Sequence, residues 1–179
     1  KQPTAEHAER DWDDGLDILR SDDADCAVSK TIRSNDQNST YYLELALTAE
    51  QAIADKYGND TSDVLLIIAN IAAKAYQEPS IGKNKIKLVV TRLIIIPNDQ
   101  LNNSGQGLYD MSKAIGRWAR RDNPVSDRDP KHYDVIALMR KTRGGGLASF
   151  NNICSRIVTS VFSDNGIGSW TTLAHEIGH

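Results

Sequence analysis

The chain has 179 residues, of which 40% are hydrophobic, and its 21 basic and 24 acidic side chains leave a formal net charge of −3. This composition is enough for one soluble globular domain, and no apolar run is long enough to predict a membrane span. The near balance of charge argues against a nucleic-acid partner and against a membrane-surface patch.

The first forty residues differ from the rest of the chain. They hold 10 acidic and 5 basic side chains, against 14 and 16 afterwards, and they show few periodic apolar positions. A polar stretch over residues 34–40 closes this part of the sequence. We therefore expect an acidic, poorly ordered pro-segment or linker over residues 1–40 and a folded domain over residues 41–179.

Strand and helix patterns then alternate. β-forming residues in alternation predict a strand over Tyr41–Ala49. Apolar positions at helical spacing between Val64 and Tyr76 predict a helix, with Ser62 as its N-cap. The aliphatic run Ile86–Ile96 is typical of a strand that is covered on both faces, which predicts a central place in the sheet.

The second half continues the alternation. An amphipathic helix is predicted from Leu108 to Trp118, followed by a strand over Tyr133–Met139. After a glycine-rich turn come two short candidate strands and a last helix; they are Leu147–Phe150, Ile157–Phe162 and a helix with Ser169 as its N-cap. This order predicts an α/β fold with a largely parallel sheet and helices packed on it.

The last helix carries the motif H-E-x-x-H, formed by His175, Glu176 and His179. Two histidines four residues apart lie on one face of a helix and can bind a single Zn²⁺. The intervening glutamate can act as general base toward a metal-activated water and later protonate the leaving amine. The motif therefore predicts a zinc peptidase. The alternative is a surface helix with solvated histidines and an ordinary glutamate.

The sequence around this motif resembles the reprolysin (adamalysin)-type metzincins, especially the ADAMTS metalloproteinases. Residues 171–179 are similar to their active-site helix, residues 76–82 to their segment Y-x-D-P-S-I-G, and residues 123–134 to N-P-P-S-D-R-H-P-E-H-Y-D. The resemblance covers roughly residues 41–179. It implies the N-terminal subdomain of a metzincin, with a twisted, mostly parallel five-stranded sheet, one antiparallel edge strand and a C-terminal active-site helix.

The family motif continues as H-E-x-x-H-x-x-G-x-x-H, and the sequence holds its first five positions. We therefore expect the catalytic domain to lack its C-terminal part, including the third zinc ligand. A distant glutamate as third ligand is the other possibility that H-E-x-x-H permits.

The resemblance also implies a calcium site. Glu44, Asp127 and Asp134 match positions at which relatives bind structural Ca²⁺, and carboxylate oxygens suit that cation. The alternative is that Asp127 caps a turn while Asp134 pairs with Arg128 or His132.

A substrate-binding strand is implied at Gly146, Leu147 and Ala148. These residues match the edge strand to which a substrate peptide adds in antiparallel orientation. The alternative is an ordinary edge strand after a glycine-rich turn.

Cys26 and Cys154 are the two cysteines of the chain, too few for a disulfide scaffold. Cys26 could act as a cysteine switch, because a thiolate can occupy the open position of a zinc ion. Cys154 matches a family cysteine and is either bridged or a small buried residue.

Three N-x-[S/T] sequons, at Asn38, Asn59 and Asn102, predict glycosylation. The sequence thus predicts a secreted zinc endopeptidase, with Ca²⁺ as a second metal, that hydrolyses extracellular proteins. The alternative is a non-catalytic fragment or binding module with an incomplete two-histidine zinc site.

Overall fold

The computed structural model describes residues 39–101, 107–142, 144–149 and 155–179. The predictions for residues 1–38, which include Cys26 and Asn38, and those for Asn102 and Cys154 lie outside these ranges. The regular elements are β1 (Thr40–Glu50), α2 (Gln51–Tyr57), η2 (Gly58–Asp60), α3 (Thr61–Ala75), η3 (Pro79–Ile81), β2 (Lys85–Ile96), η4 (Asn98–Gln100), α4 (Leu108–Asp122), β3 (Val135–Arg140), β4 (Gly146–Ala148), β5 (Val158–Ser163) and α5 (Ser169–Ile177).

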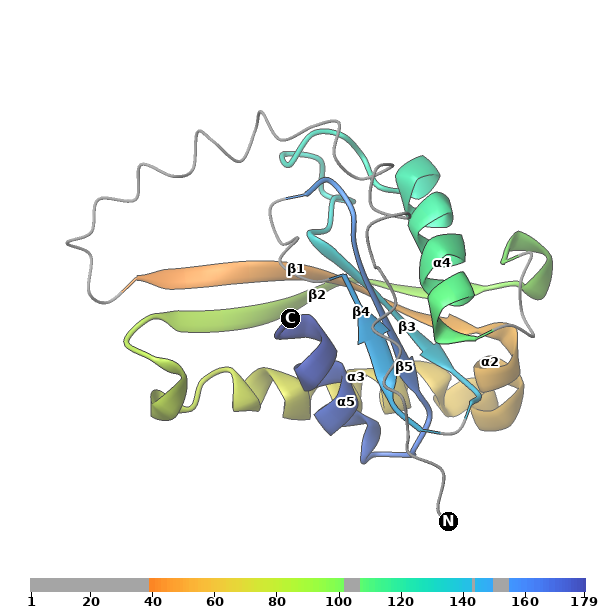
Figure 1. The fold of residues 1–179 in the computed structure, drawn as a ribbon, viewed down its shortest axis with the longest axis horizontal. Coiled ribbons are helices and arrows are strands. Elements are labelled where there is room, and N and C mark those ends of the chain that lie inside the picture. The colour runs from red at the N-terminus through yellow and green to blue at the C-terminus, as the bar shows by residue number, and fades with distance from the viewer. Residues whose placement is uncertain (1–38, 102–106, 143, 150–154) are drawn as a thin grey trace, which may run out of the picture.

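The predicted sheet is present, with five strands in the order β2-β1-β3-β5-β4 (Figure 1). Strands β2, β1, β3 and β5 run parallel, and β4 pairs with β5 in antiparallel orientation. The structure thus confirms an α/β fold with a mostly parallel sheet and one antiparallel edge strand.

The sheet separates two hydrophobic cores. Alternate residues of β1 face opposite sides, so Leu45 and Leu47 pack with α3 and α5 while Ala46 packs with α4. Figure 1 shows α3 and α5 below the sheet and α4 above it. Helix α5, which carries the start of the H-E-x-x-H motif, therefore lies in the same layer as α3.

The prediction that Ile86–Ile96 is a central strand is wrong. β2 is the outermost strand and, among the described strands, pairs with β1 alone. The strand is aliphatic because its C-terminal half contributes to both hydrophobic cores. Leu93 packs on the α3 side of the sheet and Ile96 on the α4 side. Its N-terminal half alternates between exposed and half-buried residues.

Both N-cap predictions are also wrong. Ser62 lies inside the first turn of α3, which begins at Thr61. Ser169 is the first residue of α5, and its Oγ accepts a hydrogen bond from the backbone N–H of Asn165 at 2.7 Å. Its hydroxyl thus stabilises the turn that precedes the helix.

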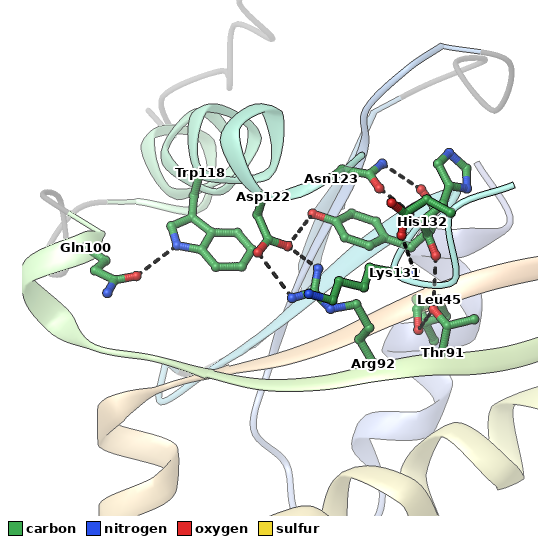
Figure 2. Close-up of polar contacts among 11 residues, drawn as sticks. Leu45, Thr91, Arg92, Gln100, Trp118, Asp122, Asn123, Lys131 and His132 are labelled. Carbon is green, nitrogen blue, oxygen red and sulfur yellow. Dashed lines mark hydrogen bonds and ion pairs between the residues drawn. The ribbon is translucent and has the colours of Figure 1, made fainter. Parts of the chain in front are cut away.

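A polar network on the α4 side holds the segment between α4 and β3. Asn123 and Tyr133 are joined by two hydrogen bonds, Nδ2 to the Tyr133 carbonyl at 2.8 Å and the Tyr133 N–H to Oδ1 at 3.1 Å. Arg92 donates from both terminal nitrogens to Asp122, and the Tyr133 hydroxyl donates to the same carboxylate at 3.2 Å. Figure 2 shows this network, which attaches α4 to β2.

Candidate metal centre

Helix α5 places the zinc motif by burying one face and exposing the other. Ser169, Leu173 and Glu176, at successive spacings of four and three residues, are buried. His175 is exposed on the other face, and His179, two residues beyond the end of α5, is exposed as well. The glutamate and the histidines of one motif therefore have different surroundings.

The two histidine side chains converge. Their Nε2 atoms are 3.1 Å apart and their ring centroids 4.6 Å apart. Two nitrogen ligands at about 2.0–2.1 Å from a tetrahedral zinc ion would be about 3.3 Å apart. The separation of the two Nε2 atoms is thus close to that of two corners of a tetrahedral zinc site.

Glu176 is 7% exposed, and its carboxylate packs against the backbone of β4. A Cβ atom on Gly146 would lie 2.5 Å from Glu176 Cγ and 2.6 Å from Oε1, closer than real Cβ contacts allow. A glycine is therefore required at position 146 while Glu176 keeps this position. Burial raises the pKa of Glu176, and positive charge on His175 and His179 opposes that shift.

Strand β4 is an edge strand of the sheet and lies beside Glu176. Gly146, Leu147 and Ala148 are half-buried, and β4 is the last strand of the sheet, paired with β5 alone among the described strands. No other strand of the described residues pairs with its outer edge, as the addition of a substrate strand would require. The structure thus brings the predicted substrate strand and Glu176 into contact.

Two of the three predicted calcium residues lie together. The Glu44 N–H donates to Asp134 Oδ2 at 2.8 Å, and the Asp134 N–H donates to the Glu44 carbonyl at 2.9 Å. The Glu44 carboxylate lies 3.5 Å from His132 Nδ1. Asp127 is exposed in the turn that precedes β3. The calcium site stays a prediction.

Among the described residues, no group of three or more His, Cys, Asp or Glu side chains is arranged to hold a metal ion. The zinc pair is therefore without a third protein ligand within the part of the chain that the structure covers. Asn59 is exposed in η2, in keeping with a glycan acceptor, and its glycosylation also stays a prediction.

Two further contacts hold α5 and were not predicted from the sequence. The Tyr76 hydroxyl donates to the carbonyl of Ala174 at 2.5 Å, and burial raises the pKa of Tyr76 to about 12. At the other end of α5, Lys56 and Tyr57 donate to Asp164 in the turn after β5. Both contacts join residues about a hundred positions apart, so local patterns could not indicate them; the only signal for Tyr76 was its place in a family-like segment.

Comparison with known proteins supports the same interpretation. A reprolysin-group family profile described as Metallo-peptidase family M12 matches residues 24–179. "A disintegrin and metalloproteinase with thrombospondin motifs 1" of Rattus norvegicus is 33% identical over 156 residues, which is 79% of this chain and 16% of that protein. "A disintegrin and metalloproteinase with thrombospondin motifs 8" of Homo sapiens is 35% identical over 153 residues, 77% of this chain and 17% of that protein. The chain thus spans about a sixth of the length of these two relatives.

A solved structure described as "Structure of a chaperone-substrate complex" has a similar fold. It superposes with a TM-score of 0.52 at 14% identity and covers 79% of this chain and 26% of that one. At this identity the likeness concerns the fold alone. Across the described residues, no helix is long and apolar enough to cross a bilayer.

Proposed function

Because the chain belongs to metallopeptidase family M12 as a reprolysin-type domain similar to the ADAMTS proteins, we propose that it provides two zinc ligands and the general base of a zinc endopeptidase. The observation that carries this proposal is the arrangement of α5. The Nε2 atoms of His175 and His179 converge at 3.1 Å, while Glu176 of the same helix is buried against the edge strand.

Each residue has a distinct role. His175 and His179 would hold Zn²⁺, which when bound supplies a Lewis acid for the scissile carbonyl and lowers the pKa of water. Glu176 takes a proton from the attacking water as its oxygen forms the new bond to the carbonyl carbon. The same carboxyl group then gives that proton to the amine nitrogen as the C–N bond breaks.

The substrate would be an extended peptide. It would add to the free edge of β4 through backbone hydrogen bonds with Gly146, Leu147 and Ala148. Such bonds do not depend on the substrate's side chains, which supports endopeptidase action on protein chains. The contact between Gly146 and Glu176 supports this placement, because it sets the peptide beside the general base.

The remaining parts of the site are proposed from the family. We expect the third zinc ligand in a continuation of the motif as x-x-G-x-x-H, and calcium at Glu44, Asp127 and Asp134. We place the substrates outside the cell, for which the sequons at Asn38, Asn59 and Asn102 are the support in this sequence. Cys26 remains a proposed cysteine switch.

The direct test is peptidase activity on a denatured protein substrate, with zinc, for a protein extended past His179. Glu176→Gln keeps the size of the side chain and removes the base, so we expect the rate to fall by at least about a hundredfold. Circular dichroism should show the same fold in both proteins. Equal activity of the two proteins would sink the assignment of Glu176.

The second candidate is a non-catalytic binding module that takes extended peptides along the edge strand β4. With only two protein ligands, zinc affinity should be well below that of a three-histidine site. An extended protein that binds peptides along β4 but releases no cleavage products would support this candidate over the enzyme.

A further inference from the structure

Tyr76 connects two helices at the point where the zinc motif begins. It directly follows α3, and its hydroxyl donates to the carbonyl of Ala174, 98 positions further along the chain, at 2.5 Å. The same carbonyl accepts the N–H of Gly178 at 3.1 Å. One carbonyl, immediately before His175, is thus bonded both within α5 and to a residue outside it.

Gly178 lies next to this hydrogen bond. A Cβ atom at position 178 would lie 3.4 Å from the Tyr76 hydroxyl oxygen, 3.3 Å from the Ala174 carbonyl oxygen and 3.2 Å from the His175 carbonyl oxygen. The two last distances are tighter than most real Cβ contacts. The Tyr76 oxygen, at 3.4 Å, would meet such a Cβ atom at an ordinary van der Waals distance, so the hydrogen bond to Ala174 does not itself require a glycine at position 178.

Helix α3, which Tyr76 directly follows, is anchored in a hydrophobic core. Leu65, Ile68, Ala69 and Ala72 of α3 are buried in the core that α5 also joins through Leu173. A hydrogen bond from the end of this anchored helix restrains both the height and the rotation of the last turn of α5. His175 lies in that turn and His179 follows two residues after the end of α5, so their convergence depends on its placement.

We propose that Tyr76 is a positioning residue of the metal site, acting through the Ala174 carbonyl to hold the turn that carries His175 and His179. This inference rests on the proposed function, because it concerns the same zinc pair. Because Tyr76 acts through a backbone carbonyl, its effect should appear in metal affinity and in kcat, with little change in KM.

The test compares Tyr76→Phe with Tyr57→Phe in the chain of residues 1–179. Both changes remove one phenolic hydroxyl that bonds to the α5 region, but Tyr57 donates to Asp164 at 2.7 Å, before the helix begins. Zinc affinity is measured by competition with a chromophoric chelator. We expect Tyr76→Phe to weaken zinc binding by about tenfold, as for other supporting residues of metal sites, and Tyr57→Phe to stay within about twofold of wild type.

A Tyr76→Phe affinity within twofold of wild type, or an equal loss in both variants, would overturn the inference. If the wild-type chain binds no zinc, its two histidines alone hold the metal too weakly to measure, and the inference is then decided by amide hydrogen exchange. In that case Tyr76→Phe must speed exchange of the Gly178 amide more than Tyr57→Phe does. An unchanged exchange rate of the Gly178 amide in Tyr76→Phe would overturn the inference.

Discussion

The position of Glu176 depends on a residue far away in the sequence that has no side chain. Gly146 lies against the glutamate, and any Cβ there would come within 2.5–2.7 Å of three of its side-chain atoms. The family-like sequence indicated Gly146 as part of a substrate strand. The structure adds a second reason for glycine, which is the space that the carboxylate occupies.

We predict that Gly146→Ala displaces Glu176 and lowers peptidase activity of the extended protein by at least about tenfold, because the displaced carboxylate no longer contacts the attacking water. Zinc affinity should change little, since the three atoms nearest to a Cβ at position 146 all belong to Glu176 and none to a histidine. The measurement is kcat/KM together with zinc competition.

Gly116→Ala is the matched control. A Cβ at Gly116 would meet Thr159 Cγ2 at an ordinary 3.5 Å, and alanine is the better helix former in α4. Its activity should stay near wild type. Full activity of Gly146→Ala would show that Glu176 can work from another position.

At the scale of elements, the turn between β5 and α5 is held by a buried carboxylate. Burial alone would raise the pKa of Asp164, but hydrogen bonds from Lys56, Tyr57 and the Gly166 N–H outweigh it and lower the pKa below its usual value. A group whose pKa is lower in the folded state stabilises the fold above its unfolded pKa, about 4 for aspartate. That contribution is lost as pH falls through the lowered value.

We predict that Asp164→Asn lowers the free energy of unfolding by about 1–2 kcal/mol at pH 7, a modest figure because Lys56 is 41% exposed and partly screened. Below pH 4 the difference from wild type should shrink as the wild-type carboxylate becomes protonated. Urea unfolding between pH 3 and pH 7 measures both effects.

Asp55→Asn, a change of an exposed aspartate on α2, serves as control and should stay within about 0.5 kcal/mol of wild type. A pH-independent difference between Asp164→Asn and wild type would contradict the assigned charge effect.

Local sequence patterns predicted which of these segments form strands, but not where each strand lies in the sheet. The alternation over Tyr41–Ala49 predicted β1 (Thr40–Glu50) to within one residue at each end, because a strand between two cores must alternate toward both. The run Ile86–Ile96 predicted a strand correctly but placed it wrongly, since contact with two cores does not require two strand neighbours.

The short helix α2 was missed because, of its seven residues, Ile53 alone is buried, which leaves almost no periodic signal. The zinc pair was predictable for the opposite reason. The i, i+4 geometry of a helix decides the spacing of His175 and His179 without help from the rest of the fold.

At the scale of the whole molecule, the sheet separates the polar network of α4 from the candidate metal centre. Helices α3 and α5 share one layer, and the edge strand β4 extends the sheet beside α5 (Figure 1). Family membership, the converging histidines and the buried glutamate are three separate observations, and all of them support one zinc site on this layer.

The measurement that tests this account most directly is zinc titration of the protein extended past His179 and of its His175→Ala variant, with Glu176→Gln as control. We predict one zinc ion per wild-type chain, at least tenfold weaker binding by His175→Ala, and near wild-type binding by Glu176→Gln, since the glutamate is no ligand. Equal zinc binding by wild type and His175→Ala would contradict the account.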